Sequence, residues 1–309
     1  MHTLEKARRF IYRNARPLDL ARWQYHFENG SKEAVIHALS YYQNADGGFG
    51  YALEPDLWNE QSSPVSTTSA TGILREIDFY DCSNKMIKAI LDYFENTSFQ
   101  HHNGWLLKIP SNNDFPHSPW WEYSKETEMG FDGAAEYNPT AGIVSFIVKA
   151  ADKSSALYKK AMDIANKAAQ KVTNHDAIEM HEAGGLVDMF ANINLADITH
   201  TPELLLQQLK NMISNVIEKD TSKWDSYIAK PSSFFNSTNS IFYADNKEIA
   251  EYECDYIITT QLPDGSWDIP WRWEGYPEEW AVAKNWWKSI GILENMLYLK
   301  GMNRIENAY

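Results

Sequence analysis

Gln43-Asn44-Ala45-Asp46-Gly47-Gly48-Phe49 is the most informative segment of the sequence. Its pattern is repeated near the other end of the chain as Gln261-Leu262-Pro263-Asp264-Gly265-Ser266-Trp267. Both copies read Gln-x-x-Asp-Gly-x-aromatic. Each follows an apolar run with helical spacing, residues 34–42 and 249–260, and each precedes a polar loop. An Asp-Gly pair favours a tight turn. We therefore expect each copy to follow one helix of a helical hairpin, with its aromatic ring packed under the end of that helix.

Weaker copies of the turn lie between these two, as Gln100-His101-His102-Asn103-Gly104-Trp105 and as Gly184-Gly185-Leu186. Two further helices are expected to begin at Asn138-Pro139 and at Thr201-Pro202, where a capping residue precedes a proline. Alternation of the kind typical of strands does not persist beyond a few residues. The sequence therefore predicts an all-α protein of about five or six helical hairpins.

The Gln-x-x-Asp-Gly-x-Trp turn after an apolar helix resembles the QW motif of squalene–hopene cyclase-like terpene cyclases and the related turns of protein prenyltransferase β subunits. The resemblance implies an α/α toroid, a closed ring of inner and outer helices around a central cavity. It makes the chain similar to single-domain prenyltransferase-like proteins. We therefore expect residues 1–309 to form one toroid domain, with the basic helical segment 1–30 packed on it.

The catalytic motifs of those relatives are missing from the sequence. It has neither the Asp-x-Asp-Asp run of cyclases that protonate an alkene nor the Asp-Asp-x-x-Asp metal site of diphosphate-ionising terpene synthases. Protein prenyltransferases hold zinc with Asp, Cys and His, but neither Cys82 nor Cys254 has a partner at ligand spacing. We expect no metal site and no cofactor.

The composition narrows the class of partner. A net charge of −14 argues against nucleic acid, since a duplex binder needs clustered lysine and arginine. The sequence lacks an apolar run of about 20 residues and an apolar signal-peptide core, so we expect a soluble cytoplasmic protein with no transmembrane segment. The 14% aromatic content, with 12 Trp, suggests a small-molecule ligand held among aromatic faces.

Three polar loops carry candidate catalytic carboxylates and ligand-binding groups. A carboxylate beside indoles loses water and becomes a general acid, while a better solvated one stays ionised. Glu54 or Asp56 paired with Glu136 would meet this need, although each of these residues could instead cap a helix or form a structural ion pair. The expected substrate-binding residues are His117, Trp120, Trp121, Asp132, Tyr137, Trp271 and Trp273. Ring closure is expected to bring the carboxylates and Trp271 and Trp273 to one end of a shared cavity.

Three functions remain open. The resemblance favours an enzyme of the terpene cyclase and prenyltransferase-like superfamily, acting by acid-initiated or lyase-type chemistry on a hydrophobic or amphiphilic ligand such as an isoprenoid. The second is a carbohydrate-active enzyme, either a glycosidase or a polysaccharide lyase. The third is a ligand-binding protein without chemistry. Polarity separates the first two, because a sugar needs several hydrogen-bonding groups around the aromatic rings and an isoprenoid needs almost none.

Overall fold

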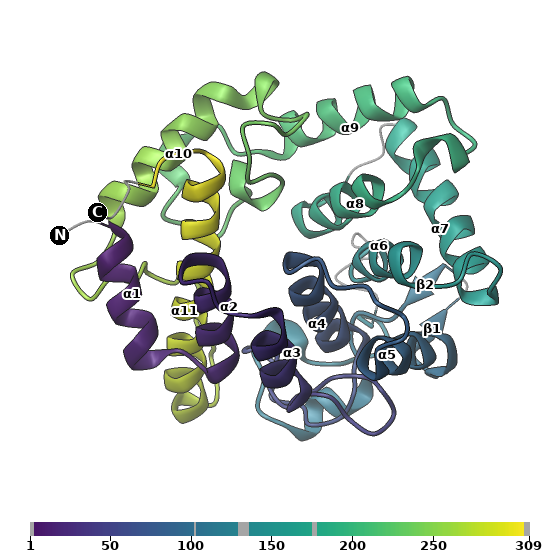
Figure 1. Cartoon of the computed structure of the whole chain (residues 1–309), viewed down its shortest axis with the longest axis horizontal. Helices are drawn as coiled ribbons and strands as arrows, with labels where there is room; N and C mark the ends of the chain where they lie inside the picture. Colours follow the sequence, from purple (N-terminus) through teal and green to yellow (C-terminus); the bar gives the residue numbers. More distant parts are fainter. Residues whose placement is uncertain (1–2, 102, 129–135, 175–177, 306–309) are drawn as a thin grey trace. The chain divides into compact units, whose positions relative to one another are not determined.

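The computed structural model describes residues 3–101, 103–128, 136–174 and 178–305 (Figure 1). Within these ranges the chain is helical, and its strands are limited to the antiparallel pair β1 (Gln100–His101) and β2 (Gly104–Trp105). The prediction of an all-α protein is confirmed. The α-helices are α1 (Thr3–Asn14), α2 (Pro17–Phe27), α3 (Lys32–Ser40), α4 (Pro64–Glu76), α5 (Lys85–Asn96), α6 (Thr140–Ala150), α7 (Ala156–Thr173), α8 (Met180–Asn192), α9 (Pro202–Val216), α10 (Lys247–Thr260) and α11 (Pro277–Gly301).

Short 3₁₀ helices occupy several connections. They are η1 (Pro110–Asp114), η2 (Pro119–Trp121), η4 (Leu195–Asp197), η5 (Thr221–Lys223), η6 (Pro231–Ser233) and η7 (Ala244–Asn246). Residues 217–246 contain only such short turns, so α9 is not followed by a second long helix of its own hairpin. None of the described helices is long and apolar enough to cross a membrane.

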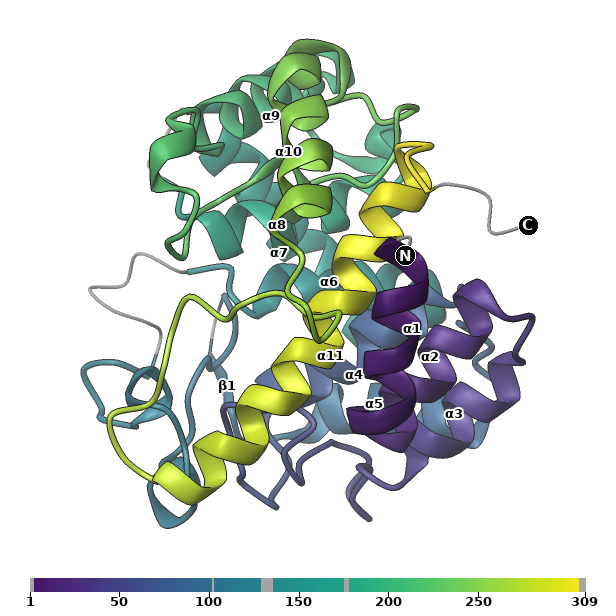
Figure 2. The ribbon, with the colours of Figure 1, turned by 90° about the vertical axis from the view of Figure 1, so that its left-hand side faces the viewer.

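The chain forms two compact units, residues 1–39 with 213–309 and residues 40–212. In the first unit, α1 and α2 both pack against the long helix α11, and Figure 2 shows α1 alongside α11. In the second unit, α6 contacts α4, α5, α7 and α8. The 1–30 segment contains two helices, α1 and α2. The closed ring implied by the resemblance stays a prediction.

Helix α6 is central to the second unit because its sequence is apolar or small on almost every side. Ile143, Val144, Phe146 and Ile147 are fully buried. A Cβ atom on Gly142 would lie 2.9 Å from the Thr68 side chain of α4, and one on Gly185 would lie 3.1 Å from that of Ala141. The prediction of a turn at Gly184-Gly185 is therefore wrong, since both glycines lie within α8, and Gly185 allows this helix to approach α6 closely.

The first turn, residues 43–49, is hydrogen-bonded to the start of α5. The Gln43 amide donates to the Gly47 carbonyl at 3.0 Å and to the Met86 carbonyl at 3.4 Å. Gly47 has φ +91°, and a Cβ there would lie 2.1 Å from the carbonyl oxygen of Ala89. Glycine is required because the backbone of α5 occupies the space of a side chain.

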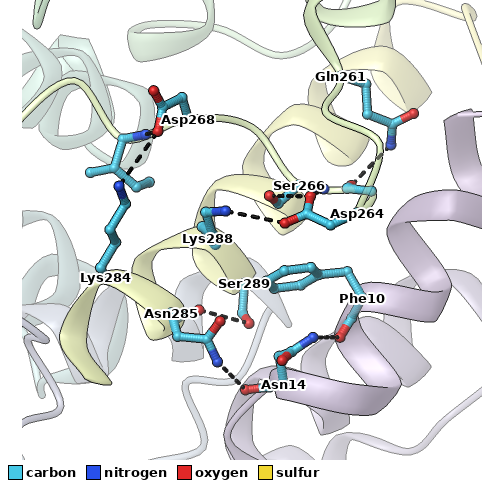
Figure 3. Close-up of polar contacts among 12 residues, drawn as sticks. Phe10, Asn14, Gln261, Asp264, Ser266, Asp268, Lys284, Asn285, Lys288 and Ser289 are labelled. Carbon is cyan, nitrogen blue, oxygen red and sulfur yellow. Dashed lines mark hydrogen bonds and ion pairs between the residues drawn. The ribbon is translucent and has the colours of Figure 1, made fainter. Parts of the chain in front are cut away.

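The second turn, residues 261–267, makes the same contacts with α1 (Figure 3). The Gln261 amide donates to the Gly265 and Thr3 carbonyls, both at 3.0 Å. Gly265 has φ +101°, and its Cβ would lie 2.2 Å from the carbonyl oxygen of Lys6. In both turns the carbonyl that faces the glycine lies three residues after the one that binds glutamine. The two turns thus occupy equivalent positions in different hairpins.

The aromatic residue of the turn contacts the end of the preceding helix, as expected. The Trp267 indole N–H donates to the carbonyl of Ile257 in α10 at 2.8 Å. The weaker central copy keeps this feature, because the Trp105 indole N–H donates to the carbonyl of Phe94 in α5 at 3.0 Å. The first turn has Phe49 instead, which is fully buried but has no side-chain donor.

The proline signals locate helix starts to within one residue. Helix α9 begins at Pro202, as predicted. Helix α6 begins at Thr140, one residue later than predicted, and its first hydrogen bond runs from the Ile143 amide to the Pro139 carbonyl. Pro139 is thus the N-cap residue, a position that was predicted for Asn138.

Candidate functional site

The predicted site residues fall into both units. Those in the second unit are Glu54, Asp56, His117, Trp120, Trp121, Glu136 and Tyr137. Trp271 and Trp273 belong to the first unit, and Asp132 lies outside the described residues. The shared cavity that these residues were expected to line stays a prediction. Within each unit, the contacts show which of them lie together.

Two loops of the second unit pair with each other and bring Asp56 beside the His117 segment. The Ser118 amide donates to the Asp56 carbonyl at 2.9 Å, and Leu57 and His117 form an antiparallel bridge. The His117 Nδ1 atom lies 2.6 Å from the Phe115 carbonyl, which can only accept, so Nδ1 carries the proton. The loop before α4 and the loop before α6 are therefore held together by backbone hydrogen bonds.

Trp121 belongs to the same pair of loops. Its ring packs against the buried side chains of Leu57, Val65 and Leu107. Its indole N–H and the hydroxyl of Ser118 are both buried without a hydrogen-bond partner among the described residues. Trp121 thus contributes to the packing of this apolar cluster. Packing is the alternative to a ligand-binding role for an aromatic side chain.

A second cluster forms around Lys171, near the end of α7. Its ammonium group lies 2.7 Å from Oε1 of Glu182 and 3.9 Å from Oε2 of Glu136. Asn103 donates its side-chain amide to the other oxygen of Glu136 at 3.1 Å. The same ammonium lies 5.5 Å from the centre of the Tyr137 ring. Two of the predicted residues, Glu136 and Tyr137, are therefore brought together around one cation.

The two carboxylates of the Lys171 cluster differ in their surroundings. Glu182 is fully buried, and its Oε2 atom has no hydrogen-bond partner in the described structure. The Glu136 side chain keeps 37% of its surface exposed. Burial raises the pKa of Glu182, and the hydrogen bond and charge of Lys171 offset only part of this increase. Of the two, Glu136 is therefore the carboxylate that a ligand can contact.

The start of α8 fixes Glu182 in place. Glu179 is the N-cap residue, and its carboxylate accepts from the amides of His181 at 2.8 Å and Glu182 at 2.6 Å. His181 Nδ1 lies 2.8 Å from the same carboxylate. A carboxylate at a helix N-terminus is stabilised by the free amides and the helix dipole. His181 thus stabilises the cap, as expected of a lone histidine beside a turn.

Sequence reasoning missed Lys171 and Glu182. A signal for Glu182 exists, because it stands on the buried face of α8 at helical spacing from Leu186 and Met189. Glu253 of α10 is a comparable buried acid with a pKa raised by burial to about 6, but both its oxygens accept from Ser232, at 2.6 and 2.9 Å. A buried acid on an apolar helix face is therefore either held by structural hydrogen bonds, as Glu253 is, or part of a functional site.

The aromatic residues of the first unit divide into two groups. Trp273 is buried, with 5% exposure, and lies 5.8 Å from Trp280 between ring centres. Trp271 is partly exposed and meets both Tyr227 and Trp287 nearly edge to face, with ring centres 5.2 Å apart in each pair. Of the two predicted tryptophans, only Trp271 combines partial exposure with aromatic neighbours on two sides.

Neither a metal centre nor an activated thiol emerges from the described residues. Among them, no three His, Cys, Asp or Glu side chains come together in a metal-binding arrangement. Burial raises the pKa of the Cys254 thiol to about 12, which keeps it protonated. The Lys171 cluster itself contains two carboxylates and one ammonium group. No protein-family model matches this chain, and no curated protein matches it either.

Proposed function

We propose that the chain is an α/α-toroid enzyme that transfers protons to or from a carbohydrate, as a glycosidase or a polysaccharide lyase does. One observation carries the proposal: a solvated carboxylate, Glu136, and a buried one, Glu182, share the ammonium group of Lys171. These groups lie just before α6, near the end of α7 and at the start of α8. They supply the density of hydrogen-bonding groups that a sugar requires.

The toroid architecture is supported by the two turns. The first turn joins one hairpin to the first residues of the next outer helix, and the second turn makes the same contact with α1. In a ring of hairpins, the same contact joins each hairpin to the next one and also joins the last hairpin to the first. The resemblance to terpene cyclases and prenyltransferases provides the same architecture.

Glu136 is the residue that we assign to proton transfer. It is exposed enough to reach a substrate, and Asn103 and Lys171 contact its two oxygens. A carboxylate that a substrate can reach and that neighbouring groups hold in place suits a general base. Lys171 and Glu182 are positioning residues. Burial and the charges of Glu136 and Glu182 raise the pKa of Tyr137, so its hydroxyl keeps its proton.

A second candidate is the isoprenoid-type reaction that the resemblance implies. It is favoured by the shared turn and by the partly exposed Trp271, since an indole face stabilises a carbocation. The polar environment of Glu136 argues for the carbohydrate. In either case the pairing of Glu136 with Glu54 or Asp56 stays a prediction.

The test is an activity screen with matched variants. The substrates are nitrophenyl glycosides, neutral and uronate-containing polysaccharides, and isoprenoid alcohols and diphosphates. Glu136→Gln is expected to reduce turnover of a carbohydrate by about 100-fold or more, the usual size of a proton-transfer contribution. Glu95→Gln is the matched control, because Glu95 is an exposed residue of α5.

Each outcome of the screen is decisive. Turnover of an isoprenoid alone would replace the carbohydrate proposal with the second candidate. Binding without turnover of any substrate would favour the non-catalytic alternative. Carbohydrate turnover that survives Glu136→Gln would show that proton transfer is carried out elsewhere.

A further inference from the structure

A cluster of three aromatic side chains in the first unit contains two buried hydrogen-bond donors that have no acceptor among the described residues. The cluster consists of Tyr227, from the loop after α9, Trp271, from the loop before α11, and Trp287, within α11. The indole N–H groups of Trp271 and Trp287 are both buried, and neither has a hydrogen-bond partner in the described structure. We call these three residues the aromatic cluster.

Two donors without acceptors in one cluster require an explanation. A buried polar group without a partner costs about 1–3 kcal/mol, and native proteins leave few of them. The Trp271 and Trp287 rings meet at 84°, so either one can direct an edge at the face of the other. An N–H contact with a ring face is only a weak hydrogen bond. The geometry therefore favours an acceptor supplied from outside the described residues.

The rings themselves are accessible. Tyr227 is 53% exposed, and Trp271 and Trp287 are each partly exposed. The cluster thus combines exposed aromatic faces with donors on its inner side. By contrast, Trp267 and Trp224, in the same unit, donate their indole N–H groups to backbone carbonyls and are buried, as structural tryptophans are.

We infer that the aromatic cluster is a carbohydrate-binding subsite, in which a sugar ring stacks on an exposed aromatic face and the Trp271 and Trp287 rings turn so that their buried indole N–H groups donate to its oxygens. The chemistry of the donors selects this class of ligand. A quaternary ammonium ion would also bind aromatic faces, but it has no acceptor for an N–H group. A hydrocarbon chain has none either. A sugar ring offers both an apolar face and several oxygens.

The inference goes beyond the proposed function, because the subsite is defined by residues of the first unit alone. It requires no catalysis and no role for Glu136. A chain that binds a polysaccharide through this cluster but has no activity would support the subsite and refute the enzyme. The reverse result, activity unaffected by any change in the cluster, would separate them in the other direction.

The binding test uses electrophoresis of the full chain in gels that contain xylan, pectin, alginate or hydroxyethylcellulose. A hexasaccharide of the polymer that retards the protein is then titrated by tryptophan fluorescence. Trp271→Ala is expected to weaken binding at least about 10-fold, and Trp271→Phe and Trp287→Phe about 5-fold or more, because each removes one hydrogen bond while keeping a ring. Trp280→Phe is the matched control, since Trp280 is partly exposed but stands outside the cluster.

A second measurement needs no ligand. Because Trp271→Phe and Trp287→Phe each remove a buried donor that has no acceptor, neither is expected to lower the thermal midpoint by more than a few degrees. Trp267→Phe, which loses a bond to the Ile257 carbonyl, is expected to lower it more. The inference is overturned if no polymer retards the wild-type protein, if Trp280→Phe weakens binding as much as Trp271→Phe, or if tetramethylammonium binds the cluster in place of the sugar.

Discussion

The two Asp-Gly turns share a backbone frame but are tied to the rest of the protein by different bonds. In both, an aspartate oxygen accepts from the amide two residues later, Gly48 at 3.0 Å in the first turn and Ser266 at 2.9 Å in the second. Both aspartates also accept from a hydroxyl. In the second turn Ser266 supplies it locally, at 2.7 Å. In the first turn it comes from Ser62, sixteen residues along the chain, at 2.6 Å.

A single residue accounts for this difference. Gly48 occupies the position of Ser266, and a Cβ there would lie 2.6 Å from the Ser62 side chain. The missing side chain therefore makes room for a hydroxyl from the end of the following loop, next to the N-cap of α4. In the second turn, the other oxygen of Asp264 accepts from Lys288 of α11 at 3.2 Å (Figure 3). The first turn is thus bonded to Ser62, close to the start of α4, whereas the second turn is bonded to Lys288, within α11.

The largest effect is expected from the two glycines that the shared frame requires. Gly47→Ala and Gly265→Ala would each place a methyl group about 2 Å from a helix carbonyl oxygen at positive φ. Each should lower the free energy of unfolding by about 3 kcal/mol or more, measured by urea denaturation. Gly275→Ala is the control, because a Cβ there meets no atom within 4 Å. A loss below about 1 kcal/mol at either turn would show that the helix backbone yields easily.

The next effect concerns the glutamines. Gln43→Met and Gln261→Met each remove hydrogen bonds to two carbonyls and should lower the free energy of unfolding by about 1–2 kcal/mol. Hydrogen exchange should rise at the start of α5 in the first variant and at the start of α1 in the second. Gln207→Met, at an exposed position of α9, serves as the control. Faster exchange spread evenly over the chain would contradict the assignment of each glutamine to one helix.

The repeated pattern allowed much of the fold to be predicted because it encodes local chemistry. An Asp-Gly pair, a capping residue or a proline acts within a few residues of itself, so the turns and the start of α9 follow from sequence. The glycines of α8 could not be interpreted in the same way. Gly184-Gly185 resembles a turn in sequence, and only the contact of Gly185 with α6 explains its presence inside a helix.

The candidate site was less predictable because its members meet only through tertiary packing. Glu136 was expected from its acidic, loop-like surroundings, but its partner Lys171 looks like any basic residue near a helix end. Glu182 was not predicted, because nothing in its neighbouring residues shows that its carboxylate is buried. Its burial depends on α7, which supplies the compensating lysine 11 residues away in sequence.

A smaller effect should separate the two hydroxyls that bind the aspartates. Ser62→Ala removes the hydrogen bond donated to Asp46 and the one accepted from Asn44, whereas Ser266→Ala removes one hydrogen bond to Asp264, and each change should cost about 1 kcal/mol. Only Ser62→Ala should increase hydrogen exchange across residues 50–62, because only Ser62 joins the loop end to the turn. The control is Ser83→Ala, where the same serine–aspartate contact with Asp81 is exposed. If Ser62→Ala and Ser266→Ala increased hydrogen exchange equally in the loops that follow the two turns, the turns would not differ in this way.

The smallest effect is expected at the ion pair that only the second turn possesses. Lys288 is 17% exposed and Asp264 is 47% exposed, so solvent screens the pair and its removal should cost less than about 1 kcal/mol. Partial burial opposes ionisation of Asp264, but the hydrogen bonds from Ser266 and Lys288 outweigh it and lower the pKa of this carboxyl. A lowered pKa means that the stabilisation is present above the ordinary value of 3.8 and is lost as the pH falls through the shifted value.

Lys288→Met removes one of the groups that lower the pKa of Asp264, so the Asp264 titration should move to higher pH. The change is best followed by NMR titration of the Asp264 carboxyl between about pH 2 and pH 6, a range that spans the ordinary aspartate value. Added salt should reduce the difference between wild type and variant, because screening weakens a pair that solvent reaches. Lys284→Met is the control, since Lys284 lies 3.7 Å from Asp268 and outside the turn. If Lys288→Met leaves the titration of Asp264 in place, the serine bonds alone set its pKa, and the second turn is no more closely tied to α11 than its backbone requires.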